Sequence, residues 1–304
     1  MKLKTLLSVL SLALLTSLAF AQDRDFSKVE MKATHVAGNV WMLECSGGNV
    51  VAGNIGVSVG PDGLLIVDDQ FAPLADKIKA ALKGIGEGKL KFVINTHWHG
   101  DHAGGNVVFG VDSTIIAHSN VRKRLNSTNT VTNQTVQPSP KTALPVITFD
   151  ESLSVHFNGE EIKAIHYPNG HTDGDGVIYF TGANVVHMGD DFVTYGFPFV
   201  DLNSGGSVEG MAKNIGDVIA KLPANIKIIP GHGPLSTIDD LKKFHQMLTE
   251  TSDIVRKQIQ AGKSLDEIKA AGLPAKFDSL SKGFVTTPIW IETIYKSQMK
   301  AAGK

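Results

Sequence analysis

The feature that most constrains this chain is the six-residue stretch His97-Trp98-His99-Gly100-Asp101-His102, which directly follows the apolar run 90–94. The run has the composition of a buried strand, so the stretch would emerge at the strand's carboxyl end. Its first two histidines stand two residues apart in extended chain and therefore point the same way, so both can reach one metal ion. The aspartate and the last histidine follow the turn that glycine permits and can reach a second ion. Imidazole and carboxylate groups without a nearby thiolate suit zinc best, with manganese, iron or cobalt as alternatives.

Three further candidate metal ligands, His171, Asp190 and His232, each come after an apolar β run. The preceding runs are 162–166, 184–186 and 226–229, respectively. Each candidate is flanked by glycine, which lets the backbone turn sharply and side chains converge. This repetition favours a built metal site over a polar, solvated loop that happens to contain histidines.

Four motifs, His-x-His-x-Asp-His, Gly-His-Thr, Met-Gly-Asp and Pro-Gly-His-Gly, run in this order from residue 97 to residue 233. Together they resemble the motifs of the metallo-β-lactamase-fold hydrolase superfamily. The resemblance implies an α/β fold, namely a four-layer αββα sandwich that carries two Zn²⁺ ions between its sheets. It also implies ligand roles by position: His97, His99 and His171 for the first ion, Asp101, His102 and His232 for the second, and Asp190 bridging both.

The amino-terminal residues 1–21 have the composition of a secretory signal peptide. Two lysines precede the apolar segment 5–18, and Ala-Phe-Ala at 19–21 fits the small-x-small cleavage rule. A membrane anchor is the alternative, but the apolar segment is shorter than the ~20 residues that a span needs. We therefore expect export to a bacterial periplasm or secretion, with 22–304 forming a single metallo-β-lactamase-like domain that ends in helices.

The balanced charge of the chain argues against a polyanionic partner. The formal net charge is −1 and 19% of the residues are charged, so nothing favours nucleic acid or an anionic membrane. We expect a small-molecule substrate, no nucleic acid, and no membrane contact after signal cleavage, while the oligomeric state stays open. Cys45 is the only cysteine, which excludes an internal disulfide and predicts a small buried apolar residue on a strand.

Residues 33–70 have the β-rich composition and turn signals of a strand meander. The glycines and asparagines between 47 and 56 predict a mobile hairpin, which in the resembled family can overhang the metals as a flap; an ordinary surface hairpin is the alternative. Asp68 and Asp69 follow the last apolar run of this region, and either could accept a hydrogen bond from the far nitrogen of a ligand imidazole; we favour Asp68.

Further along the chain, the pattern predicts strands flanked by helices, as a covered sandwich requires. We expect helices over 72–82, 210–222, 237–260 and 288–299, a capping box at 264–267, and strands over 146–149, 153–157 and 161–166. The polar, proline-broken segment 126–145 is longer than a compact domain usually keeps, so it is either a substrate-facing lid or a disordered insertion.

An aromatic-rich segment, 192–200, begins two residues after Asp190. Its rings could line an apolar pocket in which the Tyr195 hydroxyl orients a substrate carbonyl, or they could belong to the core.

The predicted ligand set suits hydrolysis. Three histidines on one zinc leave a coordination position open, and zinc-bound water titrates near neutrality. We expect a zinc-bound hydroxide to attack a cyclic amide or ester carbonyl, with Asp101 ligating the metal and orienting the nucleophile and with Tyr195 as a second catalytic candidate. No Gly-x-Ser-x-Gly elbow offers a competing nucleophile.

The sequence leaves the substrate open. Export to the periplasm favours β-lactamase activity and thus antibiotic resistance. Asp190 argues against it, because lactamases of one subclass carry cysteine at this position and those of another lack a ligand there. Aspartate is instead the pattern of lactonase, thioesterase and phosphoesterase branches, so that any lactamase activity would be promiscuous. A non-catalytic periplasmic zinc-binding accessory protein is the alternative from another class.

Overall fold

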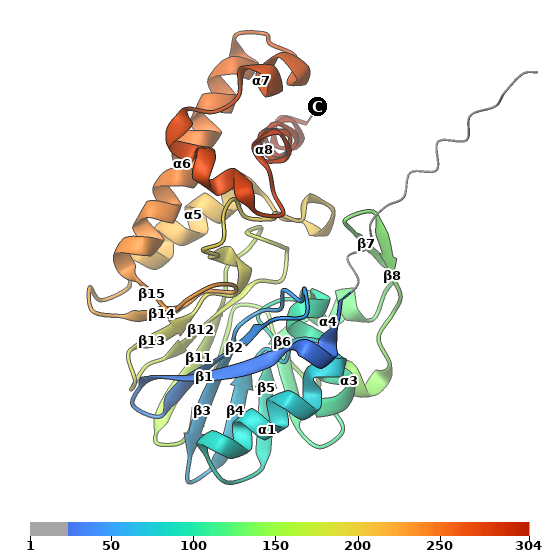
Figure 1. Ribbon diagram of the computed structural model, residues 1–304, viewed down its shortest axis with the longest axis vertical. Helices are drawn as coiled ribbons and strands as arrows, with labels where there is room; N and C mark the ends of the chain where they lie inside the picture. The colour runs from blue at the N-terminus through green and yellow to red at the C-terminus, as the bar shows by residue number, and fades with distance from the viewer. Residues whose placement is uncertain (1–23, 304) are drawn as a thin grey trace, which may run out of the picture.

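The computed structural model describes residues 24–303, which form two large β-sheets with helices around them (Figure 1). The signal peptide predicted for residues 1–21 lies outside the described residues and stays a prediction. Among the described helices, none has both the length and the apolar character needed to cross a membrane.

The first sheet has seven strands in the order β1-β2-β3-β4-β5-β6-β9. Their bounds are β1 (Glu30–Ala37), β2 (Val40–Ser46), β3 (Ile55–Gly60), β4 (Gly63–Val67), β5 (Leu90–Ile94), β6 (Thr114–His118) and β9 (Ile147–Phe149). β1 to β4 pair antiparallel and form the predicted meander. β4, β5, β6 and β9 run parallel, so their carboxyl ends lie at one edge of the sheet.

The second sheet has six strands in the order β10-β11-β12-β13-β14-β15. Their bounds are β10 (Ser152–Phe157), β11 (Glu160–His166), β12 (Gly176–Phe180), β13 (Val185–His187), β14 (Lys227–Ile229) and β15 (Ser236–Thr237). β10 to β13 pair antiparallel, whereas β13 and β14 are parallel. The segments that follow β13 and β14 therefore leave the sheet at the same edge.

Helix α1 (Ala75–Ile85) covers the outer face of the first sheet. Ala75, Ile78 and Leu82 recur at helical spacing and are buried, while lysines occupy the other face. Burying an Ile or Leu side chain stabilises the fold by roughly 1.5–3 kcal/mol. The predicted helix over 72–82 is therefore confirmed, although its first turn is a 3-10 helix, η2 (Ala72–Leu74).

The outer face of the second sheet is covered by helices α5 (Val208–Ile219), α6 (Ile238–Gln260) and α8 (Thr287–Ala301). A capping box of Thr237 and Asp240 starts α6, and one of Ser264 and Glu267 starts α7 (Leu265–Ala271), as predicted. Trp290 on α8 is fully buried and donates a hydrogen bond of 3.0 Å to Thr251 on α6.

A third apolar cluster lies between the sheets and joins Leu65 and Ile94 of the first sheet to Ile162 and Phe180 of the second. The described residues thus form helix, sheet, sheet and helix layers, each pair of neighbouring layers sharing one cluster. The predicted four-layer αββα fold is confirmed.

The segment 126–145 contains a small hairpin of β7 (Asn129–Val131) and β8 (Gln134–Val136). Its turn residues Thr132 and Asn133 both have positive φ, +49° and +64°, as a two-residue hairpin turn of type I′ requires. The disordered insertion considered for this segment is therefore wrong, because β7 and β8 pair as an ordered antiparallel hairpin.

Candidate metal centre

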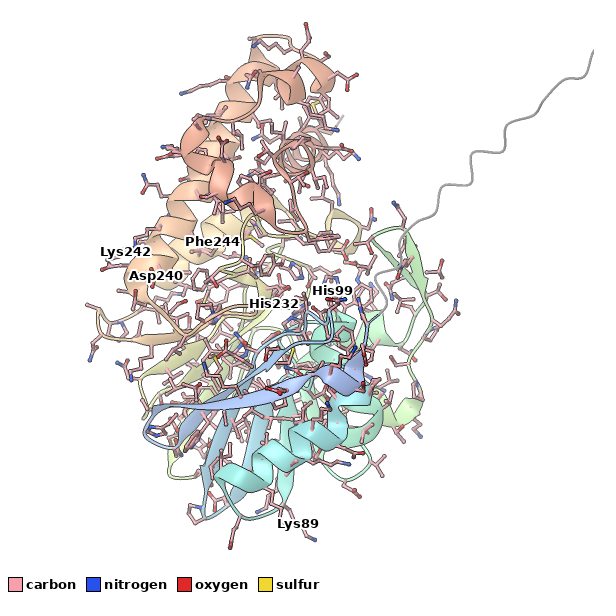
Figure 2. The ribbon with its side chains drawn as sticks, in the orientation of Figure 1. Lys89, His99, His232, Asp240, Lys242 and Phe244 are labelled. Atoms are coloured by element: carbon pink, nitrogen blue, oxygen red, sulfur yellow. The ribbon has the colours of Figure 1, made fainter. Side chains whose placement is uncertain are left out.

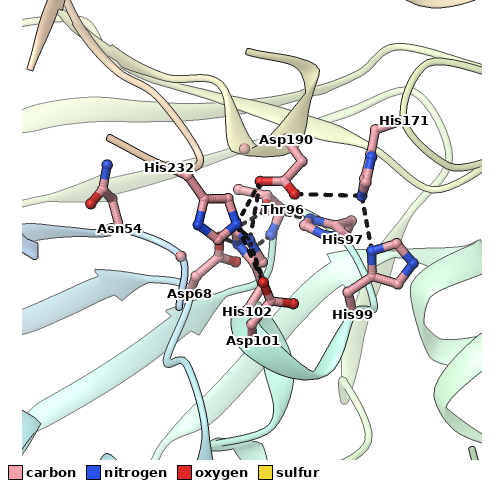
Figure 3. Close-up of polar contacts among 12 residues, drawn as sticks. Asn54, Asp68, Thr96, His97, His99, Asp101, His102, His171, Asp190 and His232 are labelled. Atoms are coloured by element: carbon pink, nitrogen blue, oxygen red, sulfur yellow. Dashed lines mark hydrogen bonds and ion pairs between the residues drawn. The ribbon is translucent and has the colours of Figure 1, made fainter. Parts of the chain in front are cut away.

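Seven side chains from four separate segments converge where the strand ends of the two sheets meet (Figure 3). They are His97, His99, Asp101, His102, His171, Asp190 and His232. They fall into three overlapping groups, and within each group the ligand atoms lie within 4.8 Å of one another. The groups are His97, His99 and His171; His97, His102 and Asp190; and Asp101, His102 and His232.

The fold brings these segments together through its parallel strands. The segment with His97 follows β5, and the segments with Asp190 and His232 follow β13 and β14. Asp101 and His102 lie on α2 (Gly100–Ala103), a single helical turn that begins directly after the strand-end segment. The hydrogen bond from Gly176 N to Thr96 O, 2.8 Å long, joins the two sheets beside the centre.

Two imidazole nitrogens in the first group face each other without a proton between them. His99 donates from Nε2 to Asp201 Oδ2 (3.0 Å), and His171 donates from Nδ1 to the Phe199 carbonyl (2.7 Å). In the neutral rings, the remaining nitrogens therefore carry lone pairs, and they lie 2.9 Å apart. His97 Nε2 is buried and has no hydrogen-bond partner among the described residues. Three lone pairs aimed at one place fit a cation.

The second group repeats this arrangement. His102 donates from Nδ1 to Asp68 Oδ2 (2.7 Å), and its Nε2, which carries a lone pair once the ring is neutral, faces His232 Nε2 at 3.2 Å. Asp101 Oδ2 lies 3.3 Å from the same atom of His232. Imidazole nitrogens and a carboxylate oxygen at one point are again the donor set that zinc accepts.

Asp190 stands between the groups. Its Oδ1 lies 3.1 Å from His102 Nε2 and 3.4 Å from His232 Nε2, while its Oδ2 lies 3.7 Å from His171 Nε2. One oxygen of Asp190 therefore faces each group.

The protonation of the two groups differs. Burial lowers the pKa of His97 well below its usual value and that of His171 to about 4, so these rings are neutral at pH 7. Burial would also lower the pKa of His232, but the carboxylates of Asp190 and Asp101 outweigh it and raise the pKa to about 9. Without metal, the second group therefore holds protons where a cation would neutralise the carboxylates, and metal binding would release them.

Asp68 supports the centre as the sequence predicted. Its fully buried carboxylate accepts from His102, from Thr96 N (2.7 Å) and from Thr96 Oγ1 (2.8 Å). Its backbone has a φ of +65°, a conformation that aspartate and asparagine adopt more readily than other residues with a side chain. Because Asp68 holds both the ligand ring and the strand-end backbone, it fixes the direction of His102 Nε2.

The predicted flap, the hairpin between β2 and β3, is anchored to the centre at its carboxyl-terminal end. Gly53 N donates to the Asp101 carbonyl (3.0 Å), and Asn54 N donates to the Gly231 carbonyl (2.7 Å). A Cβ at position 53 would lie 2.2 Å from the His102 ring, so only glycine lets the backbone pass there. Residues 53 and 54 are therefore the end of the hairpin that is bonded to the centre, and the mobility of the hairpin stays a prediction.

His187, three residues before Asp190 at the end of β13, does not join the cluster of candidate ligands. It is buried, donates from Nε2 to the Asn54 carbonyl (3.0 Å) and accepts from Gly189 N. Its role in the structure is to hold the base of the hairpin.

The aromatic segment 192–200 divides between core and site. Phe192 and Phe197 are fully buried core residues, whereas the Phe199 ring packs 5.9 Å from the rings of both His99 and His171. Tyr195 is 37% exposed, and its ring lies 5.5 Å from that of His232.

Two groups at the centre face solvent in part. The Asp101 side chain is 28% exposed, and Tyr195 is exposed to a similar degree. Burial raises the pKa of Tyr195 above its usual value, and the carboxylates of Asp190 and Asp101 add to the shift. The hydroxyl therefore stays protonated at neutral pH and can donate a hydrogen bond.

Two aspartates that no sequence pattern indicates contact candidate ligands. Asp201 caps the 3-10 helix η5 (Leu202–Ser204) with Oδ1 and accepts from His99 with Oδ2. Asp191 accepts from the backbone N of His171 (3.0 Å). The turn-forming run after Asp201 signals its capping role, but no spacing in the sequence indicates either contact with a histidine.

Comparison with known proteins agrees with this fold. The family model described as the metallo-beta-lactamase superfamily matches residues 48–234, more than half of the chain. A search of curated proteins finds no match to this chain.

Among solved structures, the chain is similar to two metallo-β-lactamases and to a sulfatase. DIM-1 metallo-beta-lactamase is 17% identical with a TM-score of 0.60, and the match covers 73% of this chain and 98% of that one. A metallo-beta-lactamase from Pontibacter korlensis is 19% identical with a TM-score of 0.58, covering 72% and 99%. A double mutant of the sec-alkyl sulfatase PisA1 is 15% identical with a TM-score of 0.66; the match covers 88% of this chain but 50% of the sulfatase. Because the family model covers most of the sandwich and these structures share its fold, the chain belongs to the metallo-β-lactamase superfamily.

Proposed function

We propose that this protein is a metal-dependent hydrolase that holds two zinc ions and cleaves an ester or cyclic amide. The observation that carries the proposal is the position of Asp190, which presents one oxygen to each of two groups of imidazole nitrogens. His97, His99 and His171 would hold one ion, and Asp101, His102 and His232 the other. Among the described residues, no other cluster of this kind is present.

Zinc ions bound there would supply a Lewis acid and lower the pKa of water. The protein's own groups would position the reactants. Asp101 is partly exposed. Before metal binds, the protonated imidazoles of His102 and His232 outweigh the effect of burial and hold the pKa of Asp101 below its usual value, so this side chain is a carboxylate. Its carboxylate can accept a hydrogen bond from the attacking water. The protonated Tyr195 hydroxyl can donate a hydrogen bond to the substrate oxygen that gains negative charge.

Asp190 favours an ester, lactone or thioester over a β-lactam as the main substrate, with β-lactam cleavage as a side activity. A second candidate is a sulfate ester, because the sulfatase match extends over 88% of this chain against 73% for DIM-1. Both candidates place the cleaved bond at the same centre. We also propose that the chain acts after export, as residues 1–21 predict.

The test is an assay of the zinc-loaded protein against β-lactam, lactone, thioester, carboxylic ester, phosphodiester and alkyl sulfate substrates. His97→Ala should abolish turnover of every substrate that wild type cleaves. His156→Ala, which removes an exposed histidine on β10, is the matched control and should keep wild-type turnover.

Metal analysis adds a measurement that does not depend on substrate choice. We expect about two zinc ions per chain in wild type and fewer in His97→Ala. One ion in wild type would exclude the bridging role of Asp190. Two ions without turnover of any substrate would favour the zinc-binding accessory protein over the enzyme.

A further inference from the structure

The C-terminal helical part of the chain reaches the metal centre through the segment between η6 (Ala275–Lys282) and α8. Figure 2 shows these helices over the edge of the sandwich at which His99 and His232 lie. Phe197 N donates to the Leu280 carbonyl (3.3 Å), and Gly283 lies against Tyr195. Residues 280–284 therefore lie alongside the site segment that begins at Tyr195.

Phe284, in this segment, is an unusual residue to expose. Its side chain is 66% exposed, although the next residue, Val285, is 1% exposed and belongs to the core of the second sheet and its helices. A fixed backbone thus holds a large apolar ring in water. Isolated exposed apolar residues are common on protein surfaces, so exposure alone does not assign a role to Phe284.

The neighbours of Phe284 connect its ring to the metal centre. Its ring packs edge to face against Phe199, 6.2 Å between centroids, and Phe199 packs against the rings of His99 and His171 at 5.9 Å. The two rings therefore form an unbroken line of contacts from His99 and His171 of the first metal group to the exposed side chain of Phe284.

We infer that Phe199 and Phe284 form an apolar subsite for the hydrocarbon part of the substrate, so that Phe284 determines specificity. The substrate class is then an ester or related compound that carries an alkyl or aryl group of several carbons next to the cleaved bond. This inference rests on the proposed function, since it takes the metal centre as the place of reaction. It assigns to the C-terminal helices a part in substrate choice.

The inference is tested by binding, without turnover. Straight-chain carboxylates from acetate to octanoate are titrated into the zinc-loaded protein by calorimetry. Each methylene that leaves water should strengthen binding by up to about fourfold. Phe284→Ala should flatten this increase and weaken octanoate binding by about tenfold while leaving acetate binding unchanged. Phe284→Leu keeps an apolar side chain and should retain most of the increase.

Val111→Ala is the matched control. Val111 is 65% exposed and precedes β6, at the opposite edge of the sheet from the strand ends that lead to the metal centre. This variant should behave as wild type throughout. For the same variants, kcat/KM measured with esters of increasing acyl length should change in the same way as carboxylate affinity, mainly through KM.

The outcomes separate this inference from the proposed function. If the affinity of wild type does not increase from acetate to octanoate, or if Phe284→Ala shows the same increase, the subsite is overturned even if esters are hydrolysed. A clear increase that Phe284→Ala abolishes, in a protein that cleaves no substrate, keeps the subsite and overturns the hydrolase. If Phe284→Ala instead turns a wild-type dimer into a monomer, the ring belongs to an interface between two copies and the subsite is overturned.

Discussion

Replacing Asp68 by asparagine should weaken one metal site and leave the other intact. The change keeps the size of the side chain, and asparagine also tolerates the positive φ found at this position. One oxygen can still accept from Thr96 N, as Asp68 Oδ1 does at 2.7 Å. The amide nitrogen then replaces Oδ2, which accepts from His102 Nδ1 at 2.7 Å.

An amide nitrogen cannot accept this hydrogen bond. His102 must either lose the bond or move its proton to Nε2, the nitrogen that faces Asp190 and His232. A hydrogen bond to a charged group contributes roughly 1.5–3 kcal/mol. At 1.4 kcal/mol for each tenfold change, zinc affinity at this site should fall about 10- to 100-fold, the range found when groups behind a metal ligand are removed.

The assay is zinc titration against a competing chelator, followed by calorimetry. Wild type should show two binding steps, and Asp68→Asn should weaken only the step that involves His102. Asp239→Asn, an exposed aspartate on α6, is the control and should leave both steps unchanged. Wild-type affinity for both ions in Asp68→Asn, or an equal loss at both, would refute the reasoning.

Three further predictions concern other parts of the centre and the fold. Gly53→Ala places a Cβ 2.2 Å from the His102 ring. In a denaturant titration it should lower the free energy of unfolding by roughly 1–3 kcal/mol, and it should also lower zinc affinity. The control is Gly84→Ala on α1, where a Cβ meets nothing within 4 Å; it should be neutral or stabilising in the same titration. Burial, reinforced by the stacked His166 ring, lowers the pKa of His118 from 6.5 to about 4, so between these pH values the unfolded chain binds more protons than the folded one. The stability contribution of His118 is thus complete above pH 6.5 and declines as the pH falls toward 4; His118→Gln should reduce this slope in urea titrations, and an unchanged slope would contradict the assignment. Removing zinc with EDTA should lower the melting temperature, because zinc at 100 times its Kd stabilises by about 2.7 kcal/mol; equal melting temperatures with and without EDTA would argue against metal binding by the folded state.

The ligands could be predicted from the sequence because their signal is local. His97, His171, Asp190 and His232 each follow a short apolar strand within a few residues, and glycine directly precedes the last three. The order of the motifs therefore indicates the fold and the place where these side chains meet. The capping boxes of α6 and α7 were predictable for the same reason, since a cap and its partner are three residues apart.

Contacts between distant segments could not be predicted. His99 and its partner Asp201 are 102 residues apart, and nothing in the sequence specifies which aspartate meets which histidine. The anchoring of Gly53 likewise depends on the backbone of Asp101 in another element, whereas local composition indicates only flexibility. Phe284 lacks any pattern of its own, because its place beside Phe199 is set by the packing of helices onto the second sheet.

The division of the candidate ligands between the two halves of the chain has a consequence for the order of folding and metal uptake. The amino-terminal half contributes His97, His99, Asp101 and His102, and the carboxyl-terminal half contributes His171, Asp190 and His232. Each group of three includes residues from both halves, so neither half offers a complete coordination set before the sheets dock. If the protein binds zinc as proposed, a nascent or unfolded chain would compete poorly for the ion, and metal uptake would report that the two halves have assembled.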